Sequence, residues 1–188
     1  MNLLDELSFD NLYYCFLTGK LSYYIVDNFC PTSCCILTDA GEIKITHMAV
    51  DKLFGLPKGG MDFKSLEEVG RDDPLVISWK NQFLEENVYK FNNSNYLEKI
   101  RDSDAGDDLF KLNFLTLFIN TFCETEMMGS CKISFLEKLV KWKDQLDKIN
   151  WCSYMIDCLV RTKSKWKPND KLCNYIGPQS LLVVSILL

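Results

Sequence analysis

Apolar residues recur along this chain at spacings that favour helices over strands. Residues 9–29 carry an aromatic or aliphatic side chain on nearly every turn, which predicts one helix or two short ones, with Gly19 as a weak point. Residues 107–122 are apolar almost all round, a pattern typical of a helix buried on most sides. We therefore expect the helix at 107–122 to lie at the centre of the core.

Five further segments carry helical predictions. Residues 74–86 read as a helix, and residues 91–106 as a loop-rich stretch around a short turn of helix. Ser134 is the expected cap of an amphipathic helix that continues through Ile149. Asn150 is the expected cap of the next helix, over 151–163, and a final apolar helix begins near residue 179.

A single β-hairpin is predicted near residues 34–45. Residues 34–38 are β-prone, 39–41 form a turn signal, and 42–45 alternate polar and apolar side chains as a half-buried strand does. Thr46 then caps a short helix that ends at Gly55, since glycine tolerates the left-handed C-cap conformation. The fold class is thus α+β and mostly α, in one domain spanning residues 1–188.

Composition agrees with a folded chain outside the membrane. The 188 residues are 47% hydrophobic, too apolar for a disordered chain, and the longest apolar run, 181–188, is far shorter than the roughly 20 residues of a spanning helix. The N-terminus carries two early acids and no basic segment, so we expect no signal peptide and a location in the nucleus, the cytoplasm or both. Nine cysteines in a reducing compartment are then interpreted as small buried hydrophobes.

Charge is unevenly distributed. The net charge is −5, yet residues 132–171 carry ten Lys or Arg against five Asp or Glu. Two interpretations stay open: two differently solvated faces, or a basic patch that meets an acidic partner or nucleic acid. The residues of the candidate basic patch are Arg161, Lys163, Lys165, Lys167 and Lys171.

No complete catalytic, cofactor or metal motif is found. His47 is the only histidine, and no second cysteine pair follows Cys30 and Cys34 at zinc-site spacing. The glycines of 55–60 close a helix rather than open one, so they are not a P-loop, and Asn113 replaces the final glutamate that an EF-hand at 102–113 would need. We therefore expect a protein that is not an enzyme and binds no cofactor or metal.

Several ordered segments are similar to one known family. The first three are Leu21 to Phe29, the predicted hairpin, and Leu53-Phe54-Gly55-Leu56-Pro57-Lys58-Gly59-Gly60. Three later segments follow in order, at 109–114, 149–152 and 176–183. In this order they resemble the plant mobile domain family, often labelled aminotransferase-like, over roughly residues 10–188. The positions that carry the resemblance, expected to be structural, are Gly55, Leu56, Pro57, Gly59, Gly60, Asn150, Trp151, Gly177 and Pro178.

The resemblance implies a transposon-derived interaction or scaffold domain of a plant intracellular protein. Such domains also occur beside SUMO-type cysteine protease domains, and the family's domain usually continues beyond the last helix, so the chain is expected to be a truncated copy. Two alternatives are a nucleic-acid-associated module using residues 132–171 and the N-terminal fragment of such a protease without its catalytic domain. The expected partner is a protein, with nucleic acid as the alternative and weak self-association through the apolar C-terminus.

Overall fold

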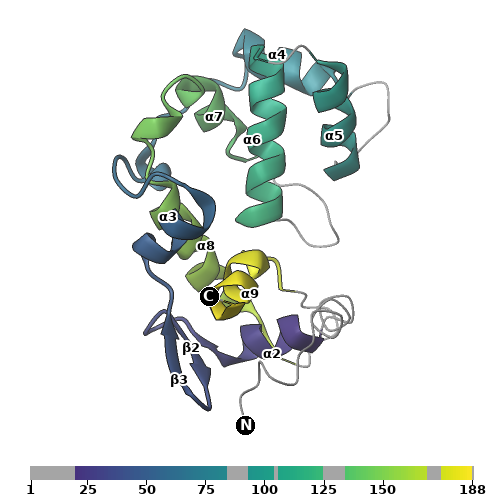
Figure 1. The fold of residues 1–188 in the computed structure, drawn as a ribbon. Helices are drawn as coiled ribbons and strands as arrows, with labels where there is room; N and C mark the ends of the chain where they lie inside the picture. The colour runs from purple at the N-terminus through teal and green to yellow at the C-terminus, as the bar shows by residue number, and fades with distance from the viewer. Residues whose placement is uncertain (1–19, 84–92, 104–105, 125–133, 169–174, 188) are drawn as a thin grey trace.

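A computed structural model describes residues 20–83, 93–103, 106–124, 134–168 and 175–187 of the chain (Figure 1). The described residues form eight α-helices, two short 3-10 helices and one small sheet. This confirms the predicted α+β, mostly α class. The α-helices are α2 (Lys20–Asn28), α3 (His47–Phe54), α4 (Pro74–Asn81), α5 (Asn93–Asp102), α6 (Asp108–Phe122), α7 (Leu136–Trp142), α8 (Trp151–Lys165) and α9 (Gln179–Leu187).

The sheet contains the predicted hairpin and one strand more. Strands β1 (Phe29–Cys30), β2 (Cys35–Thr38) and β3 (Gly41–Lys44) pair antiparallel in the order β1-β2-β3. The sequence did not predict β1, because it is only two residues long and directly continues α2. Phe29 lies opposite Ile36, and both side chains are buried, so this pair joins the sheet to the core.

The buried apolar side chains of the described residues form a hydrophobic cluster that extends from Ile25 in α2 to Val183 in α9. In Figure 1, α4 to α7 lie together at one end of the molecule, and the sheet, α2 and α9 lie at the other, with α8 between them. Helix α6 buries Leu112 and Ile119 in the cluster, as its apolar pattern predicts, although Phe114 on its other side is exposed. None of the described helices is long and apolar enough to cross a membrane.

The N-terminus of α8 is held by the loop that follows α3. Gly55 ends α3 in the left-handed conformation that the sequence predicts, and the backbone carbonyl of Pro57 accepts a hydrogen bond from the amide of Cys152 (3.2 Å). Met61 then forms a parallel bridge with Ile149, in which the amide of Asn150 donates to the Met61 carbonyl (2.9 Å). Two segments about 90 residues apart in the chain therefore meet at the start of α8.

The C-terminus of α8 is held by the segment before α9. A Cβ atom added to Gly177 would lie 2.0 Å from the hydroxyl of Thr162, so only glycine lets the chain approach α8 this closely. Pro178 is buried beside it, and α9 starts at Gln179, where the sequence predicts it. Leu181, Leu182 and Val183 are buried in the core, so these three residues are not available for the self-association considered from the sequence.

Two helix predictions were wrong in their limits. The stretch at 91–106 contains the ten-residue helix α5, which the polar sequence concealed because only Tyr96 is fully buried. The helix predicted with Ser134 as its N-cap begins at Leu136, one residue later than expected, with Phe135 at its N-cap and no side-chain cap. The same helix ends at Trp142 and does not continue through Ile149, because Ile149 pairs with Met61 in an extended bridge.

Candidate binding pocket

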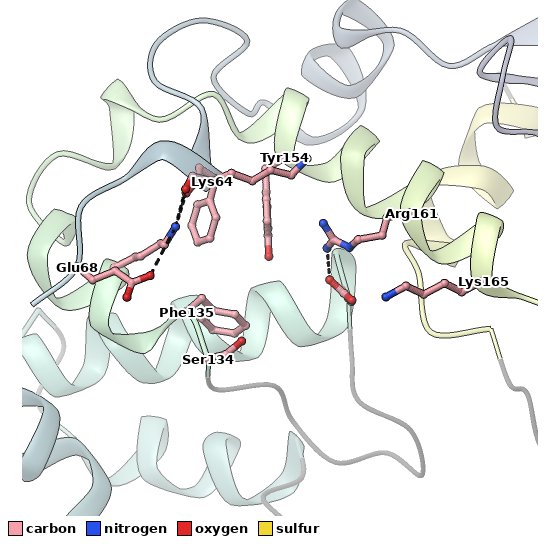
Figure 2. Close-up of a pocket in the computed structure, with 10 residues that line it drawn as sticks. Lys64, Glu68, Ser134, Phe135, Tyr154, Arg161 and Lys165 are labelled. Atoms are coloured by element: carbon pink, nitrogen blue, oxygen red, sulfur yellow. Dashed lines mark hydrogen bonds and ion pairs between the residues drawn. The ribbon is translucent and has the colours of Figure 1, made fainter. Parts of the chain in front are cut away.

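A cavity of about 430 Å³ opens between α8, α7 and the 3-10 helix η1 (Phe63–Ser65) (Figure 2). Its volume lies within the range of small-molecule and cofactor sites, roughly 300–1,000 Å³. Ten residues line it: Phe63, Lys64, Glu68, Glu124, Ser134, Phe135, Lys138, Tyr154, Arg161 and Lys165.

Helix α8 supplies one wall through a single face. Tyr154, Arg161 and Lys165 are spaced by seven and then four residues, which places them on the same side of a helix. The helix starts where it does because the side chain of Asn150 accepts a hydrogen bond from the amide of Ser153 (2.9 Å), as the sequence predicts. The bridge between Met61 and Ile149 also places η1 beside this face, so one local structure positions two walls.

The base of the pocket is aromatic. The rings of Phe63 and Tyr154 lie 4.1 Å apart between centroids, and both residues are at least 95% buried, as is Phe135. The ammonium of Lys138 lies 5.8 Å from the centroid of the Phe63 ring and donates to the carbonyl oxygens of Phe63 (3.2 Å) and Lys64 (2.8 Å). These contacts fix the position of η1 against α7.

A buried ion pair lies at one end of the pocket. Glu124, two residues beyond the end of α6, is 5% exposed and accepts a charge-assisted hydrogen bond from the guanidinium of Arg161 (Figure 2). The guanidinium also lies 3.4 Å from the sulfur of Cys158. Because a buried carboxylate is costly without a cation, this contact orients Arg161 and holds the end of α6 against α8.

Tyr154 in the pocket lining and the fully buried Cys158 beside Arg161 keep their protons at physiological pH. Burial raises the pKa of the Cys158 thiol to about 11, and burial likewise raises the pKa of the Tyr154 phenol. Neither group is therefore poised as a nucleophile or base at neutral pH, and the Tyr154 hydroxyl can serve as a hydrogen-bonding group.

The pocket carries a positive charge balance. Four of its lining residues are cationic and two are anionic, and Lys64 forms a further ion pair with Asp157 (2.6 Å) just outside the lining. Lys138 lies 3.7 Å from Glu68. The arrangement is an aromatic base with a rim of paired charges, which suits a ligand that brings its own negative group and an apolar body.

The structure brings only part of the predicted basic patch to this pocket. Arg161 and Lys165 line it, and Lys167 is exposed outside its lining. Lys163 points elsewhere: its ammonium donates to the carbonyls of Val26 (2.6 Å) and Asp27 (3.1 Å) and lies over the Trp166 ring. Lys171 lies outside the described residues.

The positions expected to be structural surround the two ends of α8. Gly55, Pro57 and Gly60 belong to the loop at its N-terminus, and the Leu56 carbonyl lies 3.2 Å from the sulfur of Cys152. Gly59 has open space where a Cβ would be, and the Trp151 indole donates to the Leu146 carbonyl (2.9 Å). None of these positions lines the pocket.

Sequence reasoning missed most of the lining residues. Phe63, Lys64, Lys138 and Glu124 come from three other segments, and nothing local in the sequence joins them. The spacing of Tyr154, Arg161 and Lys165 was a usable signal for one wall. His47 is exposed at the start of α3, and the described residues contain no group of three or more His, Cys, Asp or Glu that could hold a metal ion.

Comparison with known proteins gives the family. Residues 1–183 match the family described as Domain of unknown function (DUF8566). The chain belongs to the DUF8566 family. No curated protein and no solved structure matches this DUF8566 chain. The function of the DUF8566 domain is therefore argued from its own residues.

Proposed function

We propose that this DUF8566 domain is a non-catalytic interaction domain that binds an acidic segment of a partner protein in the pocket between α8, α7 and η1. The observation that carries the proposal is the convergence of Lys64, Lys138, Arg161 and Lys165 around an aromatic base. Charged rims set the rate and specificity of association, while aromatic surface supplies buried area. An acidic peptide with an apolar side chain offers both complements.

The resemblance to the plant mobile domain family supports the same proposal from the sequence. Under it, the domain is of transposon origin and acts as an interaction or scaffold module of a plant intracellular protein. The neutral state of Tyr154 and Cys158 agrees with recognition rather than proton transfer, because both groups hold their protons at physiological pH.

The test compares two double charge reversals of equal charge. Lys64→Glu/Lys165→Glu changes the pocket rim, and Lys52→Glu/Lys167→Glu changes two exposed lysines outside the pocket lining. Binding of a fluorescent glutamate-rich peptide containing one leucine or phenylalanine is measured by anisotropy at rising salt. We expect wild type and the control variant to bind, and the pocket variant to lose about tenfold or more in affinity.

The outcomes separate the candidate functions. Equal weakening by both variants would mean that net charge alone drives binding and would contradict the pocket proposal. Salt-dependent binding of a single-stranded oligonucleotide in place of the peptide, lost in the pocket variant, would favour the nucleic-acid module predicted for residues 132–171.

A further inference from the structure

Three cysteines lie within six residues at the turn between β1 and β2. Cys30 ends β1 and Cys35 begins β2, and the two are paired directly opposite each other in the antiparallel register. Cys34 completes the turn in the left-handed conformation, with φ of 53°. Opposite residues of an antiparallel pair have Cβ atoms about 4.5–5.5 Å apart, close to the roughly 3.5–4.5 Å that a disulfide requires.

Ser33 links the two opposed sulfur atoms. Its hydroxyl oxygen lies 2.7 Å from the Cys35 sulfur and also forms a hydrogen bond with the Cys30 thiol. The backbone groups of Ser33 and Thr32 form further hydrogen bonds to the same thiol. The turn therefore surrounds the Cys30 sulfur with groups that favour its thiolate.

The three thiols differ in ionisation. Hydrogen bonds, first from the Ser33 side chain, hold the pKa of Cys30 below its usual range, against the opposing effects of burial and of Glu42 on β3. Burial raises the pKa of Cys34 instead.

Solvent accessibility also differs between Cys30 and Cys35. Cys30 is half-buried, whereas Cys35 is fully buried. A reagent in solution can therefore reach Cys30, and Cys35 is reached most directly from across the strand pair. A solvent-accessible thiol of lowered pKa beside a second, sheltered thiol is the arrangement in which a first oxidation is captured as a disulfide.

We propose that Cys30 is a site of reversible oxidation and that Cys35 is its resolving thiol. With a peroxide as oxidant, the Cys30 thiolate attacks one peroxide oxygen, the O–O bond breaks, and Cys30 becomes a sulfenic acid while hydroxide leaves. The Cys35 sulfur then attacks the Cys30 sulfur, an S–S bond forms, and the sulfenic hydroxyl leaves as water with the thiol proton. The disulfide joins β1 to β2, and a dithiol reductant restores both thiols.

The experiment uses the full chain, reduced and then treated with one equivalent of hydrogen peroxide. Chymotryptic peptides beginning at Cys30 contain all three cysteines, so the variants supply the connectivity. We expect Cys34→Ser to form the intrachain disulfide, seen as a loss of 2 Da that a reductant reverses. We expect Cys35→Ser to lose this product and to give a sulfenic acid at Cys30 that dimedone traps.

A second measurement tests the turn itself. Ser33→Ala removes one hydrogen bond to the Cys30 thiol, so the pH at which iodoacetamide reacts half-maximally at Cys30 should rise, and the rate at pH 7 should fall about threefold. The proposal is overturned if Cys34 reacts faster than Cys30, if the disulfide in the wild type forms through Cys34, or if peroxide leaves all three thiols of this turn reduced. Each result is read by mass, independently of any binding at the pocket.

Discussion

Two neighbouring glycines, Gly59 and Gly60, occupy opposite situations in the loop before α8. Gly60 has φ of 106°, and a Cβ added to it would lie 2.2 Å from the carbonyl oxygen of Lys148. Gly59 has no positive φ and nothing within 4 Å of such a Cβ. The same residue type is therefore required at one position and optional at the next, which the sequence alone does not distinguish.

The pair gives a prediction at the residue scale. Gly60→Ala forces a side chain into a backbone carbonyl and a strained backbone, so we expect it to lower the free energy of unfolding by about 3 kcal/mol. Gly59→Ala removes conformational freedom from the unfolded chain only, so it should be neutral or stabilise by up to about 0.5 kcal/mol. Urea denaturation of both variants measures this, and equal losses would contradict the close approach of Gly60 to Lys148.

Helix N-caps are the features that the sequence predicted well. Thr46 and Asn150 each accept a hydrogen bond from an amide in the first turn of the helix that follows, as their local sequences predict. The prediction for Ser134 was wrong, because the buried Phe135 occupies the N-cap of α7 and Ser134, one residue earlier, lines the pocket. A cap depends on four adjacent residues, so a pattern reveals it unless tertiary packing overrides the pattern.

The pocket could not be predicted from the sequence, because the residues that line it come from segments far apart in the chain. Lys64 and Arg161 lie almost 100 residues apart in the chain, and both line the pocket in a fold in which Met61 pairs with Ile149. The excess of Lys and Arg over residues 132–171 predicted a basic surface in this region. Charge alone does not show which of these side chains line a site and which, like Lys163, form contacts within the fold. The side chain of Lys163 contacts the end of another helix.

The contact between Lys163 and the end of α2 leads to a prediction about how α8 stabilises α2. The Lys163 ammonium donates to Val26 and Asp27, in the last turn of α2, where cations offset the negative end of a helix dipole. We expect Lys163→Met to lower the free energy of unfolding by about 1 kcal/mol, and exposed Lys167→Met to change it by less than about 0.3 kcal/mol. Denaturation in urea compares the two, and hydrogen exchange should show faster opening of α2 in the first variant only.

An equal effect of both substitutions would mean that lysine charge acts through the whole surface, not through the α2 carbonyls. A loss confined to Lys163→Met would instead confirm that α8 holds α2, and with it the start of β1, in place. The nucleic-acid hypothesis used Lys163 as a phosphate contact, and this arrangement assigns that side chain to stability.

At the scale of the molecule, α8 joins the two ends of the fold. The loop after α3 and the bridge at Ile149 hold its start, Glu124 connects its middle to α6, and Lys163 and Gly177 connect its end to α2 and α9. In Figure 1, α6 belongs to the group of helices at one end and α2 to the sheet end. The contact between Glu124 and Arg161 is thus one of the links between these halves.

The asymmetry of this ion pair yields a last prediction. The Glu124 side chain is 6% exposed and that of Arg161 is 32% exposed, so removing the arginine leaves a buried carboxylate, whereas neutralising the glutamate leaves a cation with access to water. We expect Arg161→Met to lower the free energy of unfolding by about 3 kcal/mol and Glu124→Gln by about 1 kcal/mol. The double variant Glu124→Gln/Arg161→Met should lie within about 1 kcal/mol of wild type, because it removes both charges together. Urea unfolding of the four proteins measures the cycle, and additive losses in the double variant would mean that the two charges do not stabilise the junction of α6 and α8 as a pair.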